Sequence, residues 1–148
     1  MKDQTAKNDV REQSDLDHQE LREQLGEIQC MLAGRLSSAG EVSDAFASLS
    51  AHVAEHFIDE ESCGLFDHIT ELAPRLSDRV DTLRNEHSEF RSTMRDLNDL
   101  ASRGEGSVEW LGQIEEKFHE FSKQLMHHET KENDLLQEAY CDDIGSQD

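Results

Sequence analysis

Apolar residues recur at alternating spacings of three and four along nearly the whole chain, which is the pattern of helices packed through one face. Four segments carry this pattern, and polar or glycine-containing stretches separate them near residues 37–40, 74 and 103–106. The apolar positions are Leu21, Leu25, Ile28 and Leu32; Phe46, Leu49, Val53 and Cys63; Leu76, Val80, Leu83, Phe90, Met94 and Leu97; and Leu111, Ile114, Phe118, Phe121, Leu125 and Leu135. Because short loops force neighbouring helices to run antiparallel, the sequence predicts an all-α protein, an antiparallel up-down-up-down four-helix bundle.

The limits of this bundle follow from polar segments and helix-capping residues. Ser43 is expected to cap the second helix, and Ser107 precedes the fourth. Residues 1–13 and 142–148 are polar and acidic, and we expect them to be flexible tails. The remaining residues, 14–141, are enough for one domain with a real core.

Polar residues fill six positions of the apolar pattern, and these positions form a pattern of their own. They are His18, His56, Glu60, His87, His128 and Glu132. The first and third segments match at an offset of 69 residues, which pairs His18 with His87. The second and fourth segments match at an offset of 72 residues, the distance from Phe46 to Phe118, which pairs the two His-x-x-x-Glu motifs. The chain therefore reads as one helical hairpin written twice, and antiparallel assembly would bring the polar side chains into a pseudo-symmetric site.

The residue types at these positions indicate metal binding. Burying the carboxylates and imidazoles without a partner would cost on the order of several kcal/mol per charge, which a pair of divalent cations would offset. Nitrogen and oxygen ligands without thiolate suit iron, manganese or zinc. Because four histidines and two glutamates are too few for two octahedral shells, the carboxylates would have to bridge and small exogenous ligands would have to complete the shells. The alternative is a structural layer of buried polar side chains.

Other polar residues lie close to these positions in the sequence. His52 comes one turn before His56, and it could be a further ligand or, as we favour, the partner of a ligand. Glu61, Glu86 and Glu129 adjoin proposed ligands, but we expect them to point to neighbouring faces. We predict no catalytic residue, because no phosphate-binding loop or nucleophile motif accompanies the site.

The charge balance limits the partners of the protein. Lys and Arg number 14 against 34 Asp and Glu, a formal net charge of −20. Such a surface repels phosphate backbones and anionic lipid, so neither nucleic acid nor a membrane is an expected partner. No stretch approaches the roughly 20 apolar residues of a membrane span. Three widely spaced cysteines without a CxxC motif favour a reducing compartment. We expect a soluble cytoplasmic protein, and no protein partner is indicated.

The site residues resemble those of a known family. His18, the run His56-Phe-Ile-Asp-Glu60-Glu61, the pair Glu86-His87 and the motif His128-x-x-x-Glu132 resemble the hemerythrin-like (HHE cation-binding) domain. The resemblance implies a four-helix bundle around two iron ions in an oxo- or hydroxo-bridged centre (Fe–O–Fe or Fe–OH–Fe). It also implies four terminal histidine ligands and two bridging carboxylates. The implied terminal ligands are His18, His56, His87 and His128, and the implied bridges are Glu60 and Glu132.

The third helix separates this chain from the oxygen carriers of the family. Those proteins have a His-x-x-x-His pair there, whereas this chain has Leu83 and Arg91 around His87, and it resembles the broader, histidine-poorer branch. The function we expect is the binding of oxygen or a related small oxidant, a diatomic or peroxide ligand, for sensing, storage or detoxification. Two alternatives stay open: a di-iron oxidase or peroxidase, and a metal-free helical module whose acidic face binds a basic partner.

Overall fold

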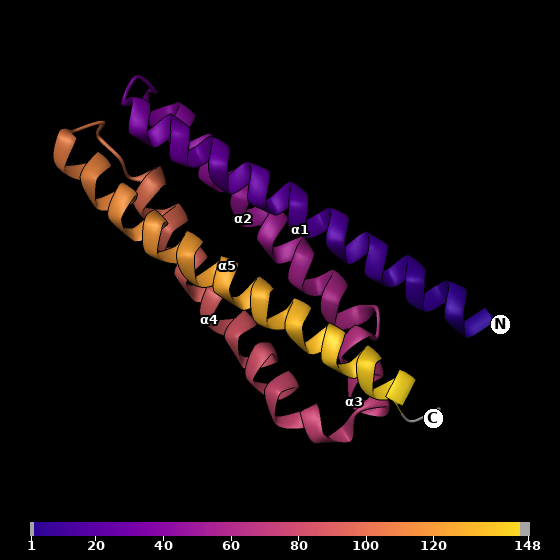
Figure 1. The fold of residues 1–148 in the computed structure, drawn as a ribbon. Helices are drawn as coiled ribbons and strands as arrows, with labels where there is room; N and C mark the ends of the chain where they lie inside the picture. The colour runs from indigo at the N-terminus through magenta and orange to yellow at the C-terminus, as the bar shows by residue number, and fades with distance from the viewer. Residues whose placement is uncertain (1, 146–148) are drawn as a thin grey trace.

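Four long helices run side by side in the computed structural model, which describes the backbone of residues 2–145 and the side chains of residues 16–141. They are α1 (Lys2–Gly34), α2 (Ala39–Ser62), α4 (Ser77–Ser102) and α5 (Val108–Gly145), and the short helix α3 (Leu65–Leu72) and the 3-10 turn η1 (Pro74–Leu76) join α2 to α4. The loops after α1 and α4 lie at one end of the molecule and α3 lies at the other (Figure 1). The helices α1 and α4 each pack against both α2 and α5. The predicted all-α antiparallel bundle is confirmed.

Serine side chains mark the starts of α2 and α5. Ser38 caps α2, because its Oγ accepts a hydrogen bond of 3.1 Å from the backbone N–H of Glu41, and the two side chains are 3.4 Å apart. The prediction that Ser43 is this cap was therefore wrong, and the helix begins about one turn earlier. The Oγ of Ser107, the residue after which the fourth helix was expected, accepts a hydrogen bond of 3.1 Å from the backbone N–H of Trp110 at the start of α5.

A break divides the segment that the periodicity predicts as one second helix. The helix α2 ends at Ser62, and the chain turns at Gly64, whose φ of +79° is a conformation that favours glycine. Cys63, which was expected in the apolar seam, is exposed at this turn. The helix α3 then closes this end of the bundle against α2, α4 and α5. Its buried side chains are Leu65, Phe66 and Ile69.

Apolar side chains form two clusters along the bundle, and the buried polar residues lie between them. On α4, for example, Val80 and Leu83 belong to the cluster beside α3, whereas Phe90 and Met94 belong to the larger cluster toward the other end. His87 lies between these two pairs and is fully buried. The same order is found on α5, so the four long helices present their polar residues at one level of the bundle.

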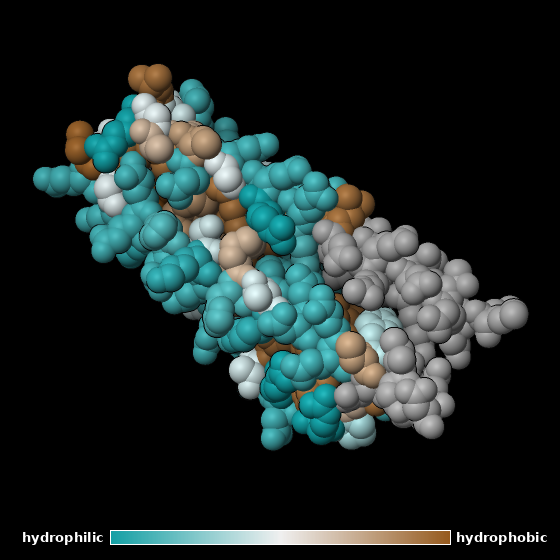
Figure 2. All heavy atoms as spheres, viewed as in Figure 1, coloured by the Kyte–Doolittle hydropathy of each residue, from teal (hydrophilic) through white to brown (hydrophobic). Residues whose placement is uncertain are grey.

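The surface is mostly hydrophilic on the face that Figure 2 shows. The large apolar side chains that are exposed in the described part of the chain are Leu16, Leu36, Ile58 and Val108. Among the described residues, none of the helices combines the length and apolar content needed to cross a membrane.

Long helices lie at both ends of the described backbone. The first helix, α1, begins at Lys2 and the last, α5, ends at Gly145, and the flexible tails expected over residues 1–13 and 142–148 stay a prediction. Met1 and residues 146–148 lie outside the described residues, and the domain boundaries stay a prediction.

Candidate metal centre

The four long helices bring together all six residues that the sequence analysis proposed as ligands. These residues are His18 on α1, His56 and Glu60 on α2, His87 on α4, and His128 and Glu132 on α5, and each is at most 4% exposed. A further carboxylate, Glu129, is 1% exposed and lies among them. The level of the bundle at which apolar packing stops is therefore filled by imidazoles and carboxylates.

These seven side chains form two groups that share one carboxylate. The first group is His18, His56, Glu60 and Glu129, the second is Glu60, His87, His128 and Glu132, and within each the potential ligand atoms lie within 4.8 Å of one another. The Oε1 atom of Glu60 contacts Nε2 of His56 and lies 3.4 Å from Nε2 of His18. Its Oε2 atom lies 3.2 Å from Nε2 of His87. Glu60 therefore offers one oxygen to each group, as a bridging ligand would.

Two carboxylates of α5 complete the groups. Oε2 of Glu129 lies 2.5 Å from Nε2 of His18, and its Oε1 lies 3.0 Å from Nε2 of His56. The expectation that Glu129 points to a neighbouring face was wrong, because α5 packs against both α1 and α4 and so buries a wider face than one seam. Oε2 of Glu132 lies 3.4 Å from Nε2 of His128, and its Oε1 lies 3.9 Å from His18, so Glu132 also reaches both groups.

The outward Nδ1 atoms of three histidines contact a second set of carboxylates. The pairs are His56 with Asp17, His87 with Glu61 at 3.0 Å, and His128 with Glu86 at 2.8 Å. His52 belongs to neither of the two groups, because its Nε2 lies 3.3 Å from Oδ1 of Asp17, on the outer side of that carboxylate. Its part in the site is indirect.

The inward atoms of the two groups meet the requirements of a pair of cations. Among the described residues, no hydrogen-bond partner is found for Glu60 Oε2, His87 Nε2, His128 Nε2, Glu129 Oε2 or either carboxylate oxygen of Glu132. Several of these atoms lie near an opposite charge, but not in hydrogen-bonding geometry. A buried polar atom left in this way costs about 1–3 kcal/mol, whereas a cation accepts lone pairs from many such atoms at once. The donor set therefore fits a two-metal site.

The comparison with known families agrees with this geometry. The chain matches the hemerythrin HHE cation binding domain over residues 9–140. It belongs to this family. No curated protein and no solved structure matches the chain.

In the metal-free HHE domain, the buried carboxylates and imidazoles strongly shift one another's pKa values. Burial, together with the charge of Glu60, raises the pKa of Glu132 to about 8. Burial opposes ionisation of Glu60 as well, but hydrogen bonds from His18 and His56 hold its pKa well below its usual range. Burial would lower the pKa of these two histidines, but hydrogen bonds with Glu129 and Glu60 raise them to about 10 and about 12. Protons thus occupy the metal-free site where cations would bind.

Aromatic rings line the second group of the HHE domain. The ring of Phe57 stacks on His87 with centroids 4.1 Å apart and an interplanar angle of 14°. The ring of Phe90 meets His128 edge to face at 5.2 Å. The second group therefore has an apolar wall, whereas the first group has the additional carboxylate of Glu129.

Proposed function

We propose that this HHE domain holds a non-haem di-iron centre that binds oxygen or a related small oxidant for sensing, storage or detoxification. The observation that carries the proposal is the pair of buried His/Glu groups sharing Glu60. Imidazole and carboxylate ligands suit iron, and the cysteines, Cys30, Cys63 and Cys141, are exposed and outside both groups. Zinc or manganese would suit the same ligands, and of these metals zinc alone has no redox chemistry.

The environment of the second group supports a small ligand. Four protein residues serve this group, and two of them, Glu60 and Glu132, also reach the first group. Such sharing leaves coordination positions for a ligand from outside. The adjacent rings of Phe57 and Phe90 exclude water and favour a small diatomic or peroxide ligand over a large polar one. In this proposal the residues of the chain hold the cations, keep the site dry and limit the size of what enters.

The first experiment is to measure the metal content and the ultraviolet-visible spectrum of protein purified in air. We expect about two irons per chain and oxo-to-iron charge-transfer bands in the near ultraviolet, as in other di-iron carboxylate sites. His128→Ala should lose iron and the bands. His119→Ala is the matched control, because His119 is an exposed histidine on the same helix and should keep both.

The outcomes separate the candidate functions. No metal, and no uptake of ferrous iron without air, would overturn the proposal and leave a helical interaction module. Zinc alone would keep the metal site and remove the redox function. Turnover of peroxide by the iron-loaded protein would favour the oxidase or peroxidase alternative.

A further inference from the structure

Each of three histidines in the two groups has a carboxylate behind it that comes from the preceding long helix. The pairs are Asp17 of α1 with His56 of α2, Glu61 of α2 with His87 of α4, and Glu86 of α4 with His128 of α5. In the sequence, each of these carboxylates adjoins a proposed ligand of its own helix. One helix thus supplies both a ligand and the support for a ligand on the next helix.

The chemistry of these contacts fixes the tautomer of the histidine. An ionised carboxylate only accepts hydrogen bonds, so the Nδ1 atom that faces it must carry the hydrogen. In the neutral imidazole that a metal requires, the lone pair is then left on Nε2, the atom that faces the ligand groups, for example 3.2 Å from Glu60 in His87 and 3.4 Å from Glu132 in His128. We propose that Asp17, Glu61 and Glu86 are positioning residues, which hold these rings with Nε2 toward the cations. This inference rests on the proposed metal centre.

The carboxylates are themselves held from the outside, so they cannot easily turn away. The Nζ atom of Lys131 lies 2.5 Å from Oε2 of Glu86, and a guanidinium nitrogen of Arg91 lies 3.2 Å from Oε2 of Glu61. His52 holds the other oxygen of Asp17. Each histidine is therefore the inner member of a series of three contacting side chains that leads toward the surface.

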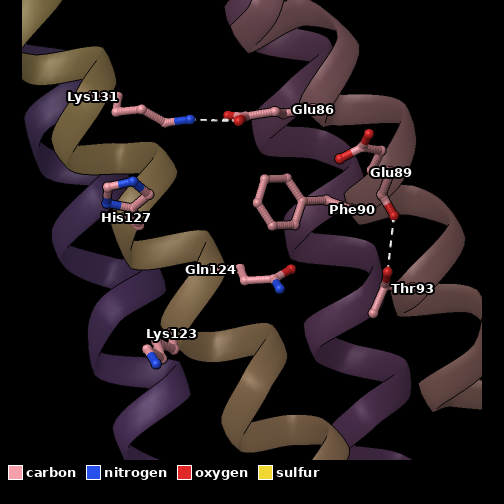
Figure 3. Close-up of a pocket in the computed structure, with 8 residues that line it drawn as sticks. All are labelled: Glu86, Glu89, Phe90, Thr93, Lys123, Gln124, His127 and Lys131. Carbon is pink, nitrogen blue, oxygen red and sulfur yellow. Dashed lines mark hydrogen bonds and ion pairs between the residues drawn. The ribbon is translucent and has the colours of Figure 1, made fainter.

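The series His128–Glu86–Lys131 ends in a groove between α4 and α5. This groove has a volume of about 310 Å³, and Figure 3 shows the pair of Glu86 and Lys131 at its edge with the ring of Phe90 between the helices. Glu89, an exposed residue, lines the same groove one turn further along α4, and in the described part of the chain its carboxylate makes no hydrogen bond or ion pair with a ligand histidine. Glu89 therefore provides a matched control for Glu86.

The test compares variants that keep or remove the acceptor behind His128. Glu86→Met fills a similar volume without an acceptor, whereas the side-chain carbonyl of Glu86→Gln can still accept the Nδ1–H. Cobalt(II) is added to metal-free protein, its dissociation constants are measured by competition with a chelator, and its visible spectrum reports the coordination geometry. Circular dichroism checks that each variant keeps its helices.

We expect Glu86→Met to weaken the binding of one of the two cobalt ions by roughly 10- to 100-fold and to change the visible bands. Glu86→Gln should recover most of the affinity and the original bands, and Glu89→Ala should behave as the unaltered chain. If Glu86→Met does not fold, the pair Asp17→Leu and Asp17→Asn makes the same comparison at His56.

Two results would overturn the inference, and they have different meanings. Binding of two cobalt ions by Glu86→Met, with unaltered affinity and bands, would remove the positioning role and leave the metal centre in place. Failure of the unaltered chain to bind cobalt would overturn both the positioning role and the proposed function.

Discussion

The two hairpins of the bundle, α1–α2 and α4–α5, repeat the same plan around the site. Each has a histidine on its first helix and a His-x-x-x-Glu motif on its second. The residue before the first-helix histidine also has the same task in both hairpins, because Asp17 contacts Nδ1 of His56 and Glu86 contacts Nδ1 of His128. The repeat therefore extends beyond the proposed ligands to the residues that support them.

The hairpins differ at the position that follows the histidine of this motif. In α2 this position is Phe57, which stacks on His87, and in α5 it is Glu129, which pairs with His18. One group thus gains a carboxylate and the other an aromatic wall. A symmetric scaffold consequently offers two unequal metal environments, and this difference can be tested by substitution.

The largest effect is expected where the two halves meet, at Glu60. Glu60→Ala removes the carboxylate that belongs to both groups, so both cations should bind more weakly, by more than the roughly 10- to 100-fold that is typical for an outer partner. Metal content after dialysis against a weak chelator measures this loss. Asp59→Ala, a change at the exposed neighbouring residue, is the control. Retention of both cations by Glu60→Ala would show that Glu60 is not a bridge.

Removal of the aromatic ring of Phe57 should chiefly affect the stability of the fold. Phe57 is fully buried, and Phe57→Ala should lower the free energy of unfolding by about 3–5 kcal/mol through lost burial and a cavity. Chemical denaturation of the metal-free protein measures the change. Ile58→Ala, at a side chain that is 57% exposed, should stay within about 0.5 kcal/mol of the unaltered chain. Equal effects of the two substitutions would contradict the packing role of Phe57.

Removal of the Glu129 carboxylate should weaken the binding of only one cation. Glu129→Leu gives the second hairpin an apolar residue at the position of Phe57, so the cation of the first group should bind at least roughly tenfold more weakly. The cation of the second group should stay, and calorimetric titration with zinc would separate the two binding steps. Equal weakening of both steps would mean that the two environments do not differ as their contacts imply.

The smallest effect concerns protons that are released when the metal binds. At pH 7 His18 and His56 hold protons in the metal-free site, because their pKa values are raised to about 10 and about 12. Metal binding requires neutral imidazole, so loading at pH 7 should release roughly two protons from the first group, and the proton of Glu132, whose pKa is about 8, should add to them. Calorimetry in two buffers of different ionisation enthalpy measures the release. Without metal, the stability from these raised pKa values is present below about pH 6.5 and is lost as the pH rises through the raised values.

The sequence predicts the bundle and most of the site because burial between packed helices follows a regular spacing. Once Phe118, Phe121 and Leu125 set the phase of α5, the next positions of the same face are His128 and Glu132, and the structure buries both. The parts that differ from prediction are local. The turn at Gly64 depends on a single positive φ, and the cap of α2 depends on Ser38 and Glu41, whose S-x-x-E spacing is a helix-start signal.

Glu129 was missed for a physical reason, although a signal for it was present. It lies one position outside the seam, and spacing alone does not show that α5 faces two neighbours there. The internal repeat, however, aligns Glu129 with Phe57, and an apolar residue at the equivalent position of the other hairpin indicates burial. Contacts such as Asp17 with His56 could not be predicted, because they depend on the rotation of each helix about its own axis.

The two apolar clusters on either side of the polar level have a consequence for cooperativity. Without cations, little apolar contact links the cluster beside α3 to the larger one, so the two ends of the bundle should open as separate units in hydrogen exchange. Cations bound by all four long helices would connect these units. The metal-bound protein would then unfold in one cooperative step. A chelator would allow the two ends to open separately, without unfolding either end.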